Sequence, residues 1–147
     1  MEREHILRQY DQELSEVRRK ILEMGEKVEL MISNAMKALR ERDSALAERT
    51  KKYDHEINRL EMEIDERCLS ILARRQPAGR DLRFVTLALK IVTDLERMGD
   101  QCVNIAKRTL ELNEEPPLQA ELDLPRLAQA ATTMVRESLD AFVRRDE

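Results

Sequence analysis

Oxygen-bearing side chains recur at helical spacing in the segment 54–65. Asp54, Asn58, Glu61 and Asp65 follow one another at steps of four, three and four positions. A helix places residues at these steps on one face, so the four side chains would form a single stripe. Each of them comes directly after an apolar residue of the same segment, which predicts that the stripe borders a buried surface.

A second acidic stripe lies in the segment 93–112. Glu96 and Asp100 are four positions apart, and Asn104 continues the line. Gly99 lies between the two carboxylates and, inside a helix, would cost about 1 kcal/mol relative to alanine. Its lack of a side chain would let another helix or a ligand approach closely, and tight helix packing is the simpler of these two uses.

Stacked carboxylates need compensation, because like charges four positions apart on a helix destabilise it by a few tenths of a kcal/mol. A divalent or trivalent cation would supply it, since hard cations take carboxylate oxygens as ligands. The alternative is a solvated stripe that carries no metal and that nearby basic side chains neutralise. The candidates for that neutralisation are Arg97, Lys107 and Arg108.

Signals for catalysis are missing from the sequence. The Glu-x-x-His spacing of carboxylate-bridged diiron bundles occurs at Glu2–His5, a single copy that we interpret as coincidence. The chain has no glycine-rich phosphate loop, no Cys-His zinc spacing and no Gly-x-Ser-x-Gly motif. Cys68 and Cys102 form no CxxC pair, and we expect both to be packed, reduced thiols. These observations predict a protein that is not an enzyme.

Apolar periodicity predicts the elements that position these stripes. Apolar residues alternate at steps of three and four from Leu7 to Ala38, from Tyr53 to Ile71 and from Val85 to Leu110. Asp43-Ser44 and the segment 76–79 interrupt the pattern as turns. Only 3% of the residues are aromatic and only seven are Gly or Pro, which disfavours a sheet and favours long helices. The predicted fold class is all-α, an antiparallel three-helix bundle.

A fourth helix after the proline-containing segment repeats the first helix. The matches at one fixed offset pair Met31 with Met134, Ala38 with Ala141, and Arg42-Asp43 with Arg145-Asp146. We therefore expect a first bundle at 1–112, a linker at 113–122, and the first helix of an incomplete second repeat at 123–147. A lone amphipathic helix cannot bury its apolar face, so it would fold back on the bundle or pack on another chain, giving a homo-oligomer.

The charge of the chain limits its partners and its location. A net charge of −4 from 26 basic and 30 acidic residues does not fit nucleic-acid binding. The longest apolar stretch, 84–92, has about half the length of a membrane span and contains Lys90. The amino terminus lacks the apolar run of a secretory signal. We expect a cytoplasmic protein, peripheral to a membrane at most.

Three motifs resemble the PhoU family of phosphate-uptake regulators. Residues 93–100 (TDLERMGD) followed by 104–106 (NIA) are similar to the family signature. The turn at 76–83 (QPAGRDLR) and the segment 54–61 (DHEINRLE) are similar to two further family motifs. The resemblance extends from residue 5 to residue 147, with the motifs in the family's order, and leaves most of the second family bundle unmatched.

The resemblance implies properties beyond those that spacing predicts. PhoU proteins consist of two homologous three-helix bundles, often dimerise, and bind metal clusters through acidic E(D)xxxD motifs. Glu96–Asp100 fits that motif, and Asp54–Asn58 fits it with Asn in the last place. The resulting expectation is a non-catalytic negative regulator of phosphate uptake and the phosphate-starvation response. Its partners would be phosphate transporter components and a sensor histidine kinase.

The expected cofactor is iron, zinc or another divalent or trivalent cation. Its expected ligands are Asp54, Asn58, Glu61, Glu96 and Asp100. The alternative function is a structural helical-bundle or coiled-coil interaction module without specific metal binding.

Overall fold

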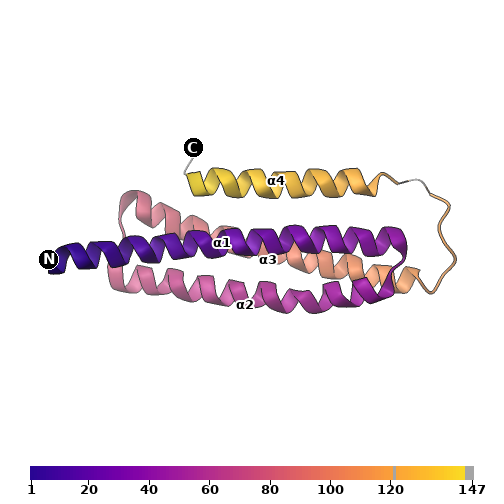
Figure 1. Cartoon of the computed structure of the whole chain (residues 1–147), viewed down its shortest axis with the longest axis horizontal. Coiled ribbons are helices and arrows are strands. Elements are labelled where there is room, and N and C mark those ends of the chain that lie inside the picture. Colours follow the sequence, from indigo (N-terminus) through magenta and orange to yellow (C-terminus); the bar gives the residue numbers. More distant parts are fainter. Residues whose placement is uncertain (121, 145–147) are drawn as a thin grey trace.

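The computed structural model describes residues 1–120 and 122–144. They form four helices: α1 (Glu2–Glu41), α2 (Ser44–Arg75), α3 (Gly79–Leu112) and α4 (Leu124–Arg144). Figure 1 shows α1, α2 and α3 side by side in one long bundle, with α4 lying along the outside of α1. No strand occurs among the described residues, and the predicted all-α, antiparallel three-helix bundle is confirmed.

The predicted apolar seams form the core of the bundle. The seam of α1 is buried from Leu14 to Ala38. Leu7, which the periodicity assigned to this seam, is instead 55% exposed, and that assignment was wrong. The reason is the length of α1, whose first turns extend past the turn between α2 and α3 and therefore have no helix to pack against (Figure 1).

The turn between α1 and α2 also holds the end of α3. Arg42 adopts a left-handed conformation with φ 55°, and the Asp43 carboxylate accepts a hydrogen bond from the Leu46 amide at 3.0 Å, as a helix N-cap does. The Arg42 guanidinium donates to three main-chain carbonyls at the end of α3 and just after it, among them that of Glu115 at 2.6 Å. These bonds use carbonyls that a helix end leaves without internal partners.

Helix α4 folds back on α1 and runs antiparallel to it. Of its described residues, only Val135 and Leu139 are buried. The Leu139 side chain packs directly over Gly25, and a Cβ at position 25 would collide with it. Between the two arrangements that a lone amphipathic helix allows, the structure therefore shows packing on the chain's own bundle.

The assignment of 1–112, 113–122 and 123–147 to a bundle, a linker and a second repeat stays a prediction. Helix α3 ends at Leu112, as the first boundary has it, and α4 begins at Leu124, one residue after the second. Arg145 and Asp146, which support the repeat, lie outside the described residues. None of the described helices is both long enough and apolar enough to cross a membrane.

Candidate functional site

The two predicted acidic stripes face each other where α2 packs on α3. Gly99 of α3 is buried there, and a Cβ at this position would lie 3.3 Å from Asp54 Oδ1 and 3.4 Å from Ile57 Cγ2 of α2. The missing side chain thus lets the two helices approach closely. This close approach brings Asp54 near Asp100 on the facing helix, so that each carboxylate lies in the field of the other.

The predicted ligands all lie along this one helix interface, within electrostatic or hydrogen-bonding reach of one another. Glu61 lies in the field of Asp54, Asp65 and Asp100, and Glu96 lies in the field of Asp54, Glu61 and Asp100. Asn58 donates a hydrogen bond of 3.4 Å to Asp54 Oδ2. We call these side chains the acidic groove. Its members are Asp54, Asn58, Glu61, Asp65, Glu96 and Asp100.

Asp65 is the member that the predicted ligand set omitted. It is half-buried, and its charge acts on Glu61 four positions before it. The same helical spacing that selected Asp54, Asn58 and Glu61 also placed Asp65 on the stripe, so the sequence did carry a signal for it. Asn104, at the end of the α3 stripe, is exposed.

The pKa values of the groove carboxyls are raised. Burial is the largest cause for Asp54, Glu61 and Asp65, and neighbouring carboxylates add to it for Asp54 and Glu61. The pKa of Glu96 rises to about 7, first through burial and then through a hydrogen bond with Asp100 and the surrounding negative charges. Burial and like charges both disfavour the ionised form, so the groove favours the uptake of a proton or a cation.

Ion pairs do not compensate this charge among the described residues, although the charge of His55 partly offsets the raised pKa of Asp54. Within the described ranges, no Lys, Arg or His forms an ion pair with a carboxylate of the acidic groove. Arg108, one of the three residues considered for neutralisation, pairs with Glu111 at 2.7 Å instead. Arg97 and Lys107 form no ion pair with the groove either. The neutralised-stripe alternative therefore lacks the contacts that it needs.

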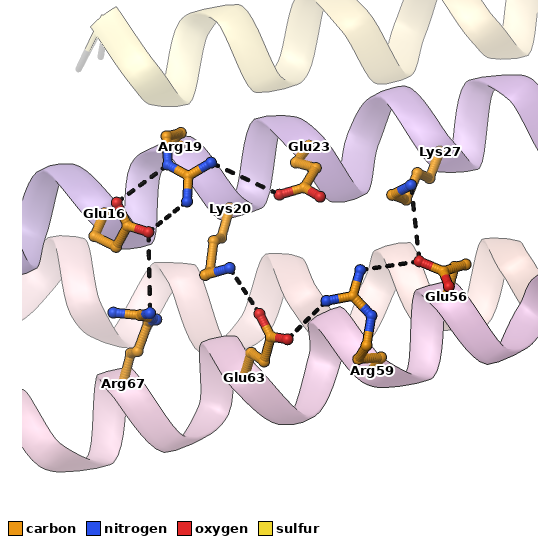
Figure 2. Close-up of polar contacts among 9 residues, drawn as sticks. All are labelled: Glu16, Arg19, Lys20, Glu23, Lys27, Glu56, Arg59, Glu63 and Arg67. Carbon is orange, nitrogen blue, oxygen red and sulfur yellow. Dashed lines mark hydrogen bonds and ion pairs between the residues drawn. The ribbon is translucent and has the colours of Figure 1, made fainter.

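The side of α2 that faces α1 differs from the acidic groove, because its charged side chains are paired with charges of opposite sign. Figure 2 shows acidic and basic side chains of α1 and α2 joined in two separate networks of ion pairs. Lys20 of α1 contacts Glu63 of α2 at 2.7 Å, and Arg59 contacts the same carboxylate at 2.7 Å. Two interfaces of one helix thus differ: the α1–α2 side is paired, and the α2–α3 side is acidic and unpaired.

The donor atoms of the acidic groove suit a hard cation. Asp54 Oδ1 is buried and has no hydrogen-bond partner, so one ligand oxygen is already without competing contacts. As placed, however, no three His, Cys, Asp or Glu side chains in the described part of the chain are arranged to hold a metal ion. A metal would therefore bind only after rotation of carboxylate side chains, which are exposed or half-buried here. Such a cation would supply positive charge to the groove.

Both cysteines are buried beside this groove, where the charges of Asp65 and Asp54 act on them. Cys68 and Cys102 are both buried, and burial raises the pKa of each thiol to about 11. A thiol with so high a pKa stays protonated near neutral pH in the metal-free protein. The expectation of packed, inert thiols agrees with their burial.

The fold and the site define a class of protein: an antiparallel helical bundle with an acidic groove on one helix interface that ion pairs do not neutralise. Comparison with known proteins gives the family. Residues 21–109 match the model of the PhoU domain, and the chain belongs to the PhoU family.

Curated relatives extend this similarity over nearly the whole chain. The chain is 44% identical to the phosphate-specific transport system accessory protein PhoU homolog of Pseudomonas putida, over 97% of this chain and 56% of that protein. It is 37% identical to the phosphate-specific transport system accessory protein PhoU of Escherichia coli strain K12, over 97% of this chain and 59% of that protein. The chain thus spans less than two thirds of the length of these relatives.

A solved structure agrees with the fold. The crystal structure of PhoU from Pseudomonas aeruginosa superposes with a TM-score of 0.87 at 41% sequence identity. The match covers 93% of this chain and 66% of that one. The predicted family and the predicted fold class are confirmed.

Proposed function

We propose that this protein is a non-catalytic, cytoplasmic negative regulator of phosphate uptake and of the phosphate-starvation response. The names of its relatives, accessory proteins of the phosphate-specific transport system, support this role. Phosphate transporter components and a sensor histidine kinase are the proposed partners. A reporter of the starvation response tests the role in cells that lack their own PhoU. Expression of the chain should lower reporter activity when phosphate is plentiful, and unchanged activity would contradict the proposal.

The acidic groove is the proposed regulatory metal site. The observation that carries this part is a buried Asp54 oxygen without a hydrogen-bond partner, beside carboxylates that form no ion pair in the described part of the chain. Hard cations such as Fe³⁺ or Mg²⁺ take such oxygen ligands. The proposed ligands are Asp54, Asn58, Glu61, Glu96 and Asp100.

Metal analysis of purified protein tests the site directly. The wild type and a double variant, Glu96→Gln with Asp100→Asn, would be loaded with Fe³⁺, Zn²⁺ or Mg²⁺, desalted, and measured for bound metal. Asp94→Asn is the matched control, because Asp94 is an exposed carboxylate on the same helix but outside the groove. We expect metal retention by the wild type and the control and its loss in the double variant. Equal retention by all three proteins would refute the site.

A second candidate function is a helical interaction module without specific metal binding. The arrangement of the groove favours it, since no three carboxylates are disposed around a common point among the described residues. The two candidates differ in the response of the melting temperature to metal. A cation that binds only the folded state at 100 times its Kd would add about 2.7 kcal/mol of stability. A melting temperature that the metal leaves unchanged would favour the interaction module.

A further inference from the structure

One segment of this acidic chain is strongly basic. Residues 67–93 include six basic residues and one acidic residue, a net charge of +5, whereas the whole chain carries −4. The basic residues are Arg67, Arg74, Arg75, Arg80, Arg83 and Lys90. The segment contains the turn between α2 and α3, which Figure 1 shows at the end of the bundle where α1 begins. Positive charge is therefore concentrated toward one end of the molecule.

The turn between α2 and α3 is held in place by its own backbone and by α1. Gln76 and Gly79 both adopt left-handed conformations, with φ of 46° and 58°. Asp81, the one acidic residue of the basic segment, accepts a hydrogen bond of 2.9 Å from the Tyr10 hydroxyl of α1. The turn is therefore a defined scaffold, and its single carboxylate is already engaged.

Three arginines beside this turn have no acidic partner among the described residues. Arg74 lies in the last turn of α2, Arg80 and Arg83 lie in the first two turns of α3, and all three are exposed. None of them forms an ion pair there. The charge of Arg74 acts on Glu13, but that carboxylate accepts two hydrogen bonds from Arg75, at 3.1 and 2.9 Å. We call Arg74, Arg80 and Arg83 the basic tip.

Helix α3 itself disfavours part of this charge. Arg80 lies in its first turn, where the positive end of the helix macrodipole disfavours a cation. The N-cap residue Ala78 offers no side-chain hydrogen bond that would offset the cost. Local choices that oppose the fold are expected mainly at functional sites, so the placement of this charge is better explained by binding than by stability.

We propose that the basic tip binds an acidic segment of a protein partner, through the carboxylates of its Glu and Asp side chains. Arginine presents a planar fork of donors that matches a carboxylate, and it is enriched among the residues that dominate the energy of protein interfaces. Leu82, between Arg80 and Arg83 in the sequence, is 41% exposed and offers apolar contact beside these charges. The inference deepens the regulatory proposal and rests on it only for the biological identity of the partner.

An anionic membrane fits the basic tip less well than a protein segment does. Lipid recognition typically uses a cluster of about four to eight basic residues, and the basic tip has three. The first turns of α1 also extend past the turn between α2 and α3 (Figure 1), and their charges cancel, with Glu2 and Glu4 against Arg3 and Arg8. A flat surface that approached this end of the bundle would meet those turns first, whereas a narrow peptide can lie beside them.

Peptide binding tests the basic tip directly. The probe is a fluorescein-labelled peptide of alternating Glu and Ala, whose fluorescence anisotropy is followed during titration with the whole chain. The tip variant carries Arg74→Gln, Arg80→Gln and Arg83→Gln. The matched control removes the same charge at three exposed positions outside the tip, through Arg97→Gln, Lys107→Gln and Arg126→Gln. Circular dichroism checks that both variants keep the helical content of the wild type.

The comparison of the two variants decides the outcome. We expect the tip variant to bind the peptide at least tenfold more weakly than the wild type and the control do. Equal weakening in both variants would show attraction to the overall charge and would overturn the proposal, as would a wild type that does not bind the peptide. Vesicles of phosphatidylcholine and phosphatidylserine provide the second arm. Vesicle binding that only the tip variant loses, with peptide binding unchanged, would assign the tip to a lipid surface and overturn the proposal.

The reporter of the starvation response separates this inference from the proposed function. The wild type and the control should lower reporter activity when phosphate is plentiful, and the tip variant should lose most of that effect. Equal repression by the tip variant and the wild type would overturn the inference and leave the regulatory role intact. No repression by the wild type would contradict the regulatory role, and the peptide titration would still decide whether the basic tip binds an acidic segment.

Discussion

Gly99 of α3 and Asp54 of α2 are in direct apposition: a Cβ on residue 99 would lie 3.3 Å from Asp54 Oδ1. This contact sets the distance between the two helices at the acidic groove. It also leaves the Asp54 oxygen buried without a hydrogen-bond partner. The close approach of α2 and α3 at Gly99 therefore also brings the negatively charged side chains together.

Enlarging residue 99 should separate the helices. For Gly99→Ala we expect a change in unfolding free energy within about 1 kcal/mol, because the gain in helix propensity offsets a tight but tolerable contact. Gly99→Leu should destabilise the protein by about 1–3 kcal/mol, since overpacking displaces Ile57 and the α2 backbone. Urea denaturation measures both. Equal stability of the alanine and leucine variants would contradict the assigned close approach.

The raised pKa of Glu96 predicts a pH dependence of stability in the metal-free protein. The folded state holds this proton up to about pH 7, whereas the unfolded chain releases it near the ordinary value of 4.5. Folding thus takes up a proton between these values, and the contribution of Glu96 to stability falls as the pH rises from about 4.5 to about 7. Asp54, Glu61 and Asp65, whose pKa values are also raised, act in the same direction.

Glu96→Gln isolates this effect, because glutamine does not titrate. The difference in unfolding free energy between variant and wild type should shift in favour of the variant as the pH rises from 4.5 to 7. Urea midpoints at four or five pH values, with a chelator present, measure it. Asp94→Asn is the control and should follow the wild type. A difference that stays constant with pH would show that Glu96 titrates near its ordinary value.

Lys20 and Glu63 should respond unequally to removal of their partner. Lys20 is buried, and its ammonium contacts Glu63 at 2.7 Å, while Glu63 also holds Arg59 (Figure 2). Glu63→Leu leaves a buried amine without its partner and should cost about 1–3 kcal/mol. Lys20→Met leaves Glu63 paired with Arg59 and should be neutral or stabilising.

Chemical denaturation of these two variants gives the comparison. Glu56→Leu is the control, because Glu56 pairs with Arg59 and Lys27 in more exposed positions and should cost less than about 1 kcal/mol. Equal destabilisation by Glu63→Leu and Lys20→Met would contradict the prediction that the buried Lys20 depends on its partner more than Glu63 does.

Both cysteines should react slowly in the native protein. Cys68 and Cys102 are buried, and burial raises each thiol pKa to about 11, so the thiolate is rare near neutral pH. Labelling with a disulfide reagent should therefore be limited by opening of the bundle and should accelerate in parallel with urea unfolding. Fast labelling of either residue at pH 7.5 without urea would contradict its packed position.

The sequence by itself determined the three-helix bundle, because a seam of apolar residues at steps of three and four can be buried only between helices. It also placed Asp54 and Glu61 on one stripe and Glu96 and Asp100 on another, since helical spacing decides which side chains share a face. Helix ends followed from Asp43 and from the proline-containing turns. The family was recognisable from motifs such as 93–100, which the family match over residues 21–109 confirms.

Tertiary structure alone decided which partners these surfaces meet. Leu7 continues the seam in sequence but is exposed, because burial depends on how far the neighbouring helices extend. The pairing of Glu63 with Lys20, beside a groove where Asp54 and Glu96 have no such partner, depends on the rotation of α2 between two helices. The packing of Leu139 over Gly25 brings together residues from distant parts of the chain, and periodicity within one helix carries no information about that contact.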